Sequence, residues 1–170
     1  MEIRPFDRID LTKVLPALSI DEAARIRRAA ARIDLSAPAP GRSGWTWFPD
    51  RVTYTESGER WVVFGIAFSY ASGPQRDGVE FDLSVIREQP PSLAVEISTD
   101  IDCWCETDHR YHTIRSQSWL VGTPESFIQA FESATATLAQ WITGSHTAAD
   151  YRVTTGLPSP SVTLGSGSQN

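Results

Sequence analysis

The residues Val79–Ser98, VEFDLSVIREQPPSLAVEIS, decide the fold of this chain. Apolar and polar residues alternate before the Gln-Pro-Pro-Ser turn, and the alternation resumes after it. A period of two is typical of strands that bury one face. A hairpin closed at this turn sets Val85 opposite Val95, and the turn before it sets Phe68 opposite Phe81. Because both pairings keep the apolar side chains on one face, these residues predict neighbouring antiparallel strands.

Three strands are predicted upstream, joined by a turn at Pro49-Asp50 and a hairpin loop at Glu56-Ser57-Gly58. The glycine suits the left-handed position of a three-residue loop. Pairing across this loop sets Val52 opposite Val62. Each turn length keeps the apolar residues on one face, and this agreement favours a single sheet. The three predicted strands span residues 45–48, 51–55 and 59–70.

The stretch Leu93–Leu120 holds both cysteines, two of the three histidines and two of the six tryptophans. A turn at Thr107-Asp108 makes it a hairpin in which Cys103 lies opposite His112 and Trp104 lies opposite Tyr111. In this register Cys103, Cys105 and His112 face the core. The acidic residues and the large aromatic residues then face outward.

Two helices are predicted to flank the sheet. Ser19 and Glu22 form a capping-box pattern, which predicts a helix from about residue 20 to Ile33. Thr123-Pro124-Glu125 is a typical start for a second, longer helix, and Gly144 is a natural stop. The apolar stripe of this second helix is wide enough to pack on the sheet.

The predicted fold is therefore α+β. It is a six-stranded antiparallel meander sheet with a long C-terminal helix and a shorter N-terminal helix packed on one face. Residues 1–18 are predicted to form an N-terminal arm, residues 19–144 a single α+β domain, and residues 145–170 a mostly flexible C-terminal tail.

Composition narrows the class of partner and the location. The net charge of −6 disfavours nucleic acid, which needs a basic surface, and favours a basic partner. Charged residues interrupt the first apolar positions, and no apolar run reaches membrane-spanning length, so we expect a cytoplasmic protein without a signal peptide or membrane contact. Every basic residue except Lys13 is arginine, which we attribute to a GC-rich bacterial genome.

Metal binding is the first kind of site that the sequence suggests. Cys103, Cys105, His109 and His112 are zinc-ligand types, but their spacing is not an established zinc pattern. The hairpin register places His109 on the opposite face from the others. Two alternatives remain: an irregular loop that brings all four ligands together, or a site with an open position that is held by Cys103, Cys105 and His112. We favour buried thiols that continue the apolar series of the strand, and we predict no metal or other cofactor.

Catalysis is the second kind of site considered. The acids and histidines of the hairpin offer general acids and bases. No nucleophile motif, phosphate-binding loop, zinc-protease motif or dinucleotide fingerprint accompanies them. We therefore assign no catalytic residue and expect a non-enzymatic protein.

The outer face of the predicted sheet is the third candidate, and the one we favour. Large aromatic residues on a face that no predicted helix covers indicate a binding surface, and acids around them would steer a basic partner. One alternative is that these aromatic residues only stabilise the sheet as cross-strand pairs. A second alternative is that the N-terminal arm or the C-terminal tail covers this face. Besides Glu80, Asp82, Val63 and Glu106, the face is predicted to carry the partner-binding residues Trp61, Glu96, Asp100, Asp102, Trp104, Tyr111, Arg115 and Trp119.

These features predict a bacterial protein-binding module, such as an immunity or antitoxin-like protein or an adaptor, that recognises a basic protein partner. The alternative is a small-molecule-binding protein or enzyme. Its pocket would lie between the sheet and the C-terminal helix, near Phe64, Phe68, Phe81, Cys103 and His112.

Overall fold

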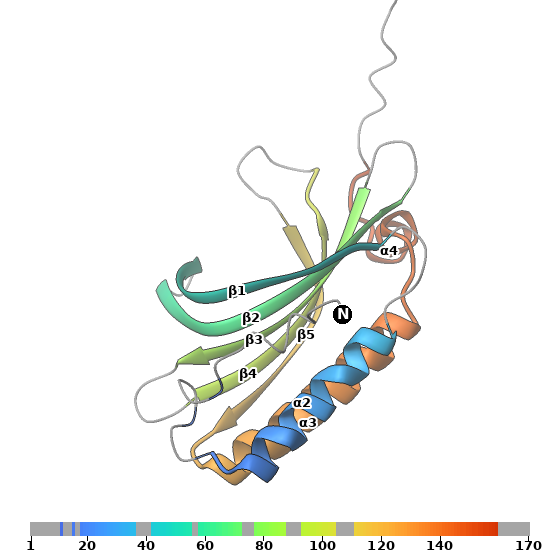
Figure 1. The fold of residues 1–170 in the computed structure, drawn as a ribbon. Coiled ribbons are helices and arrows are strands. Elements are labelled where there is room, and N and C mark those ends of the chain that lie inside the picture. Colours follow the sequence, from blue (N-terminus) through green and yellow to red (C-terminus); the bar gives the residue numbers. More distant parts are fainter. Residues whose placement is uncertain are drawn as a thin grey trace, which may run out of the picture.

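A five-stranded antiparallel sheet with helices on one face forms the described part of the chain, so the α+β class is confirmed (Figure 1). This computed structural model describes Leu11, Leu15 and residues 18–36, 42–55, 58–72, 77–87, 93–104 and 111–159. Neighbouring strands follow chain order. They are β1 (Arg42–Thr55), β2 (Gly58–Ser72), β3 (Asp77–Arg87), β4 (Leu93–Asp102) and β5 (Tyr111–Val121).

The predicted count of six strands is wrong, because the residues assigned to the first two strands form the single strand β1. Phe48 pairs with Gly65 and Arg51 pairs with Val62, so the chain passes through Pro49-Asp50 without turning. Proline has no backbone N–H to donate, and it is tolerated here because β1 is an edge strand. The pairing with β2 is also shifted by one residue from the prediction, since Val52 lies opposite Trp61 rather than Val62.

The central strands pair as the sequence predicts. Phe68 lies opposite Phe81, and Val85 lies opposite Val95. One irregularity interrupts the pairing of β2 with β3, between Val62 and Phe64. An extra residue at such a bulge reverses the facing of the side chains before it.

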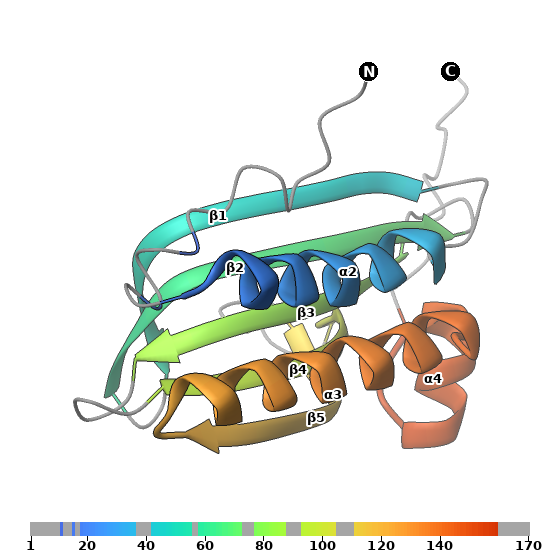
Figure 2. The same cartoon turned by 60° about the horizontal axis from the view of Figure 1, so that its bottom comes forward.

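The helices α2 (Ile20–Ser36) and α3 (Pro124–Thr143) lie side by side on one face of the sheet (Figure 2). Both predicted caps are present: Glu22 accepts the Ser19 backbone N–H at 2.8 Å, and the Thr123 side chain accepts the Ser126 N–H at 3.2 Å. Arg25 joins the helices through Nε and Nη2, at 3.1 and 2.9 Å from the Glu132 carboxylate. This ion pair holds the pKa of Glu132 below its ordinary value.

The core lies between these helices and the inner face of the sheet. Phe127 and Phe131 of α3 stack with ring centroids 5.9 Å apart, and Phe131 lies 6.4 Å from Phe64 of β2. All three side chains are buried. Burying aromatic area of this size is a large part of what stabilises a domain of this length. From the predicted arm, Leu11 is buried in the same core.

A short helix, α4 (Ala148–Thr155), follows α3. It lies inside the segment 145–170, for which the sequence predicts a mostly flexible tail. Asp150 and Thr147 cap it, and Gly156, at φ 72°, ends it in the left-handed conformation that glycine adopts without strain. The first part of the predicted tail therefore contains a helix.

Truncation of Phe131 tests the core. We expect Phe131→Ala to lower the free energy of unfolding by about 3–5 kcal/mol, because it removes a buried ring and leaves a cavity. Urea denaturation measures this loss. Ser133→Ala, at an exposed position of the same helix, should change stability by less than about 0.5 kcal/mol. Equal effects of the two changes would contradict this packing.

Candidate functional site

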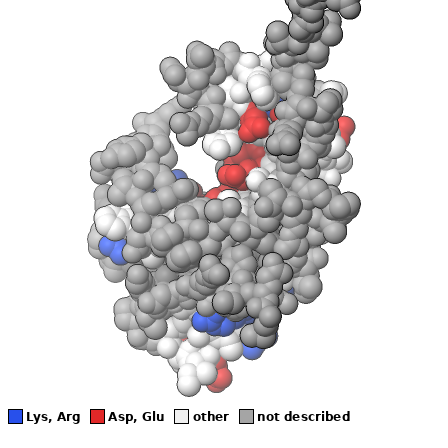
Figure 3. Space-filling view, turned by 45° about the horizontal axis from the view of Figure 1, so that its top comes forward, with Lys and Arg blue, Asp and Glu red and all other residues white. Residues whose placement is uncertain are grey.

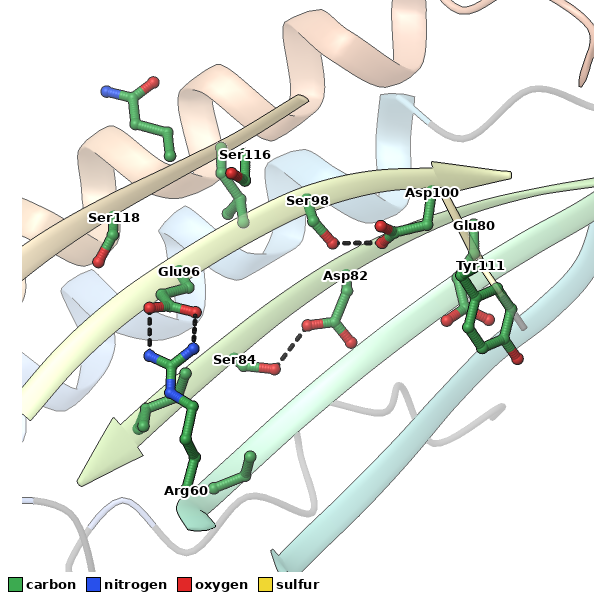
Figure 4. Close-up of a pocket in the computed structure, with 14 residues that line it drawn as sticks. Arg60, Glu80, Asp82, Ser84, Glu96, Ser98, Asp100, Tyr111, Ser116 and Ser118 are labelled. Carbon is green, nitrogen blue, oxygen red and sulfur yellow. Dashed lines mark hydrogen bonds and ion pairs between the residues drawn. The ribbon is translucent and has the colours of Figure 1, made fainter. Parts of the chain in front are cut away.

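The most distinctive feature of the sheet is a hollow of about 550 Å³ on the face opposite the helices (Figure 4). Residues of β2, β3, β4 and β5 form its walls. A volume of this size is within the usual range of ligand sites, roughly 300–1,000 Å³. The hollow is lined by Arg60, Val62, Glu80, Asp82, Ser84, Ile86, Glu96, Ile97, Ser98, Asp100, Tyr111, Ser116, Gln117 and Ser118.

The alternation of β3 and β4 is the reason that polar groups gather there. Successive side chains of a strand point to opposite faces. Because Phe81 and Leu83 are buried under the helices, Asp82 between them must point outward. On β4, Ile97 is buried in the same core and its neighbour Glu96 points outward. Antiparallel pairing then brings the outward residues of neighbouring strands together, and Asp82 lies directly opposite Ser98.

Hydrogen bonds hold most of these carboxylates in place. Arg60 donates to Glu96 through both terminal nitrogens, one of them at 3.0 Å. Asp82 accepts from the hydroxyl of Ser84 at 2.5 Å. Asp100 accepts from the hydroxyls of Ser98 and Thr113. Dashed lines in Figure 4 mark several of these contacts.

The charge of the hollow is strongly negative. Its lining includes four carboxylates and one guanidinium, that of Arg60. All four acidic residues are partly exposed, and Figure 3 shows acidic side chains gathered where this surface is hollowed. Fixed, partly exposed carboxylates accept hydrogen bonds from cations, and concave acidic surfaces attract cations from solution.

Three of the residues predicted to bind a partner line this hollow. Glu96 and Asp100 come from β4. Tyr111, which is 47% exposed, comes from the start of β5. Sequence reasoning missed the contribution of Arg60. The sequence alternation of β2 does not predict it, because the bulge after Val62 changes the face to which the side chains of this part of β2 point.

The other five residues predicted to bind a partner do not line the hollow, and two of them, Arg115 and Trp119, come from β5. The observed pairing is Val95 with Trp119 and Thr99 with Arg115. The predicted register, which sets Cys103 opposite His112, would instead pair Asp100 with Arg115. A shift of one residue moves a side chain to the other face. Trp119 therefore packs against the core, and Arg115 reaches the backbone carbonyl of Trp141 in α3 at 3.2 Å.

Trp61 is likewise on the face away from the hollow. It alternates with Arg60 and Val62, which line the hollow, and the guanidinium carbon of Arg87 lies 5.4 Å from its ring centroid. Val63, also predicted to face outward, is buried in the core. The bulge in β2 is the physical reason for both differences.

Asp102 and Trp104 lie near a buried ion pair that fastens α4 to the sheet. Arg152, only 2% exposed, donates through Nε and Nη2 to the Asp77 carboxylate at 2.8 and 2.7 Å. It also donates to the backbone carbonyl of Asp102. Trp104 donates its indole N–H to Asp77 at 3.2 Å. Asp102 Oδ2 accepts the backbone N–H of Gly78 at 3.0 Å.

The protonation of Asp77 follows from these contacts. Burial alone would raise the pKa of this carboxyl, but hydrogen bonds from Arg152 and Trp104, together with the charge of Arg152, outweigh it and lower the pKa. Trp104 and the backbone of Asp102 thus belong to a structural cluster at the end of the sheet.

The candidate metal ligands are only partly described. Cys103 and His112 are half-buried, and His112 pairs with Ile101 rather than with Cys103. Cys105, His109 and Glu106 lie outside the described residues. Among the residues that the structure describes, no three His, Cys, Asp or Glu side chains are grouped closely enough to hold a metal ion.

Comparison with family models, with curated proteins and with solved structures finds no match to this chain. Within the described residues, every helix is too short or too polar to cross a membrane.

Replacement of Asp77 tests the ion pair. We expect Asp77→Asn to lower the free energy of unfolding by about 3–5 kcal/mol at neutral pH, because Arg152 keeps a buried charge without its counterion. A carboxyl whose folded pKa is lowered stabilises the protein fully above its unfolded pKa of about 3.9. That contribution is lost as pH falls through the lowered folded pKa.

Urea denaturation at a series of pH values should therefore show a difference between wild type and Asp77→Asn that is constant above about pH 5 and shrinks on acidification. A difference that grows toward low pH would contradict this account.

Proposed function

We propose that this protein is a non-enzymatic binding module whose outer-face hollow takes a basic segment of a partner protein. The observation that carries the proposal is the concentration of four carboxylates against one guanidinium in a single concave site. Hydrogen bonds within the site orient Asp82, Glu96 and Asp100 before a partner arrives. Groups oriented in advance lose less conformational entropy on binding.

An arginine or lysine side chain fits this chemistry well. Carboxylates such as Asp82 and Asp100 can each accept charge-assisted hydrogen bonds from a guanidinium. Tyr111 adds an exposed aromatic ring at the side of β5, where a cation can pack on its face. The chain's net charge of −6 would speed the encounter with a basic protein.

An immunity or antitoxin-like protein that neutralises a basic toxin would use such a surface, as would an adaptor. Our proposal is this class of bacterial protein, acting in the cytoplasm. It assigns the capture of the partner to Glu80, Asp82, Glu96, Asp100 and Tyr111, the acidic and aromatic lining of the hollow.

A ligand pocket between the sheet and α3 receives less support. Phe64, Phe81 and Phe131 are buried at that interface, and the rings of Phe64 and Phe131 are in contact distance. Of the side chains expected to line a pocket there, Phe64 and Phe81 pack in the core instead.

Neutralisation of single carboxylates tests the proposal. A fluorescent arginine-rich peptide serves as the probe, and anisotropy gives its dissociation constant. We expect Asp82→Asn and Glu80→Gln each to weaken binding by up to about fivefold, which corresponds to ~1 kcal/mol for a solvent-screened ion pair. Added salt should weaken wild-type binding as well.

The matched control is Asp21→Asn, which removes one negative charge from an exposed position of α2. This change should leave the dissociation constant of the peptide nearly unchanged. If Asp21→Asn weakened binding as much as Asp82→Asn, attraction would follow net charge alone, and the assignment of the hollow would be overturned.

A further inference from the structure

The two edges of the sheet are protected very differently. Exposed edge strands invite pairing with other chains, and proline and charged residues commonly prevent it. β1 carries Pro49, Asp50 and Arg51 in succession. β5, an eleven-residue strand at the other border of the sheet (Figure 2), contains no proline, glycine or acidic residue.

The one arginine of β5 is directed away from the edge. Arg115 donates from Nε to the Thr99 hydroxyl at 3.1 Å, and its guanidinium carbon lies 4.6 Å from the ring centroid of Trp141. Nearby, Leu120 is 73% exposed and Trp119 is half-buried. The edge of β5 thus combines apolar side chains with little charge, the composition that favours strand pairing.

We propose that β5 pairs with β5 of a second copy of this chain, so that two sheets join into one. This inference is independent of the function proposed for the hollow. Self-pairing is favoured here because the strand itself carries no carboxylate, although the chain as a whole is acidic with a net charge of −6. Elsewhere on the surface, two copies would repel one another more strongly.

The register of this pairing follows from symmetry. A two-fold axis perpendicular to the sheet keeps both outer faces on the same side. Because directly opposed residues share a face, this axis must lie midway between the two copies of one residue, which then face each other across the new strand pair. β5 pairs with β4 in one unbroken register from Arg115 to Val121. The centre of that stretch is Ser118, so Ser116 lies opposite Leu120 of the second copy.

Two estimated distances indicate that neither helix α3 nor Glu96 obstructs the joined sheet. Helix α3 packs on β3, β4 and β5, so it lies roughly above β4. The two β4 strands would be three strand spacings apart, ~14 Å, which exceeds the 8–10 Å at which helices pack. Glu96, opposite Ser118, would be equally far from its copy, beyond the ~10 Å screening length at 0.1 M salt.

The joined sheet changes what the molecule presents to a partner. Ser116 and Ser118 line the hollow as well as the edge. Because the axis is perpendicular to the sheet, both hollows open on the same face and lie side by side. A partner with two basic segments would then bind both at once, with a gain in avidity.

Sedimentation equilibrium on the purified full chain, without partner, tests the inference. We expect wild type to reach twice the mass of one chain at concentrations up to millimolar. Leu120→Lys should be monomeric, because a lysine on the edge opposes pairing. Val153→Lys, on exposed α4, is the matched control and should remain dimeric. A monomeric wild type, which would leave the edge to another occupant, or a dimeric Leu120→Lys would overturn the proposal.

Cross-linking tests the register. In a background with Cys103→Ser and Cys105→Ser, Ser118→Cys should form an intermolecular disulfide, because opposed Cα atoms about 4.5–5.5 Å apart are within disulfide reach. Ser133→Cys, exposed on α3, should not. Equal cross-linking of the two variants, or none at residue 118, would overturn the pairing of β5 about Ser118.

Discussion

The two-residue alternation of β3 and β4 is the constraint on which the rest of the structure depends. Phe81 and Ile97 are buried in the core, so the residues between the buried positions must face away from the helices. The packing of the inner face and the polarity of the outer face are therefore coupled. The same alternation that supplies the core also collects Asp82, Glu96 and Asp100 on one outer surface. A change of register in these strands would bury carboxylates and expose aromatic rings, which explains why one pairing is strongly favoured.

The centre of the sheet was predictable because each strand there has a clear alternation and each turn has one compatible length. The edges were not. Pro49 looked like a turn, yet an edge strand can contain proline because one side of its backbone needs no partner. The pairing of β4 with β5 shifts between Thr99 and Asp100 of β4, and sequence alternation alone does not reveal a bulge. That shift explains why Arg115 and Trp119 were assigned to the wrong face.

The position of α4 was unpredictable for a different reason. Its sequence is polar, and its most buried large side chain is Arg152, whose counterion Asp77 is 75 residues earlier. A local pattern cannot identify such a pair, since either residue alone would be expected at the surface. The ion pair also explains why Trp104 belongs to a structural cluster at the end of the sheet. Acidity on the outer face was predictable from alternation, whereas Arg60 joined it through the bulge in β2.

The molecule thus has three distinct surfaces: helices that cover the core, an acidic hollow on the opposite face, and an edge strand with little charge. The central claim is that the hollow is where a basic partner binds. Backbone NMR shifts recorded during titration with an arginine-rich peptide test this most directly. The account predicts shifts concentrated at Glu80, Asp82, Ser98, Asp100 and Tyr111. Shifts concentrated instead on α2 and α3, with the hollow unchanged, would contradict it.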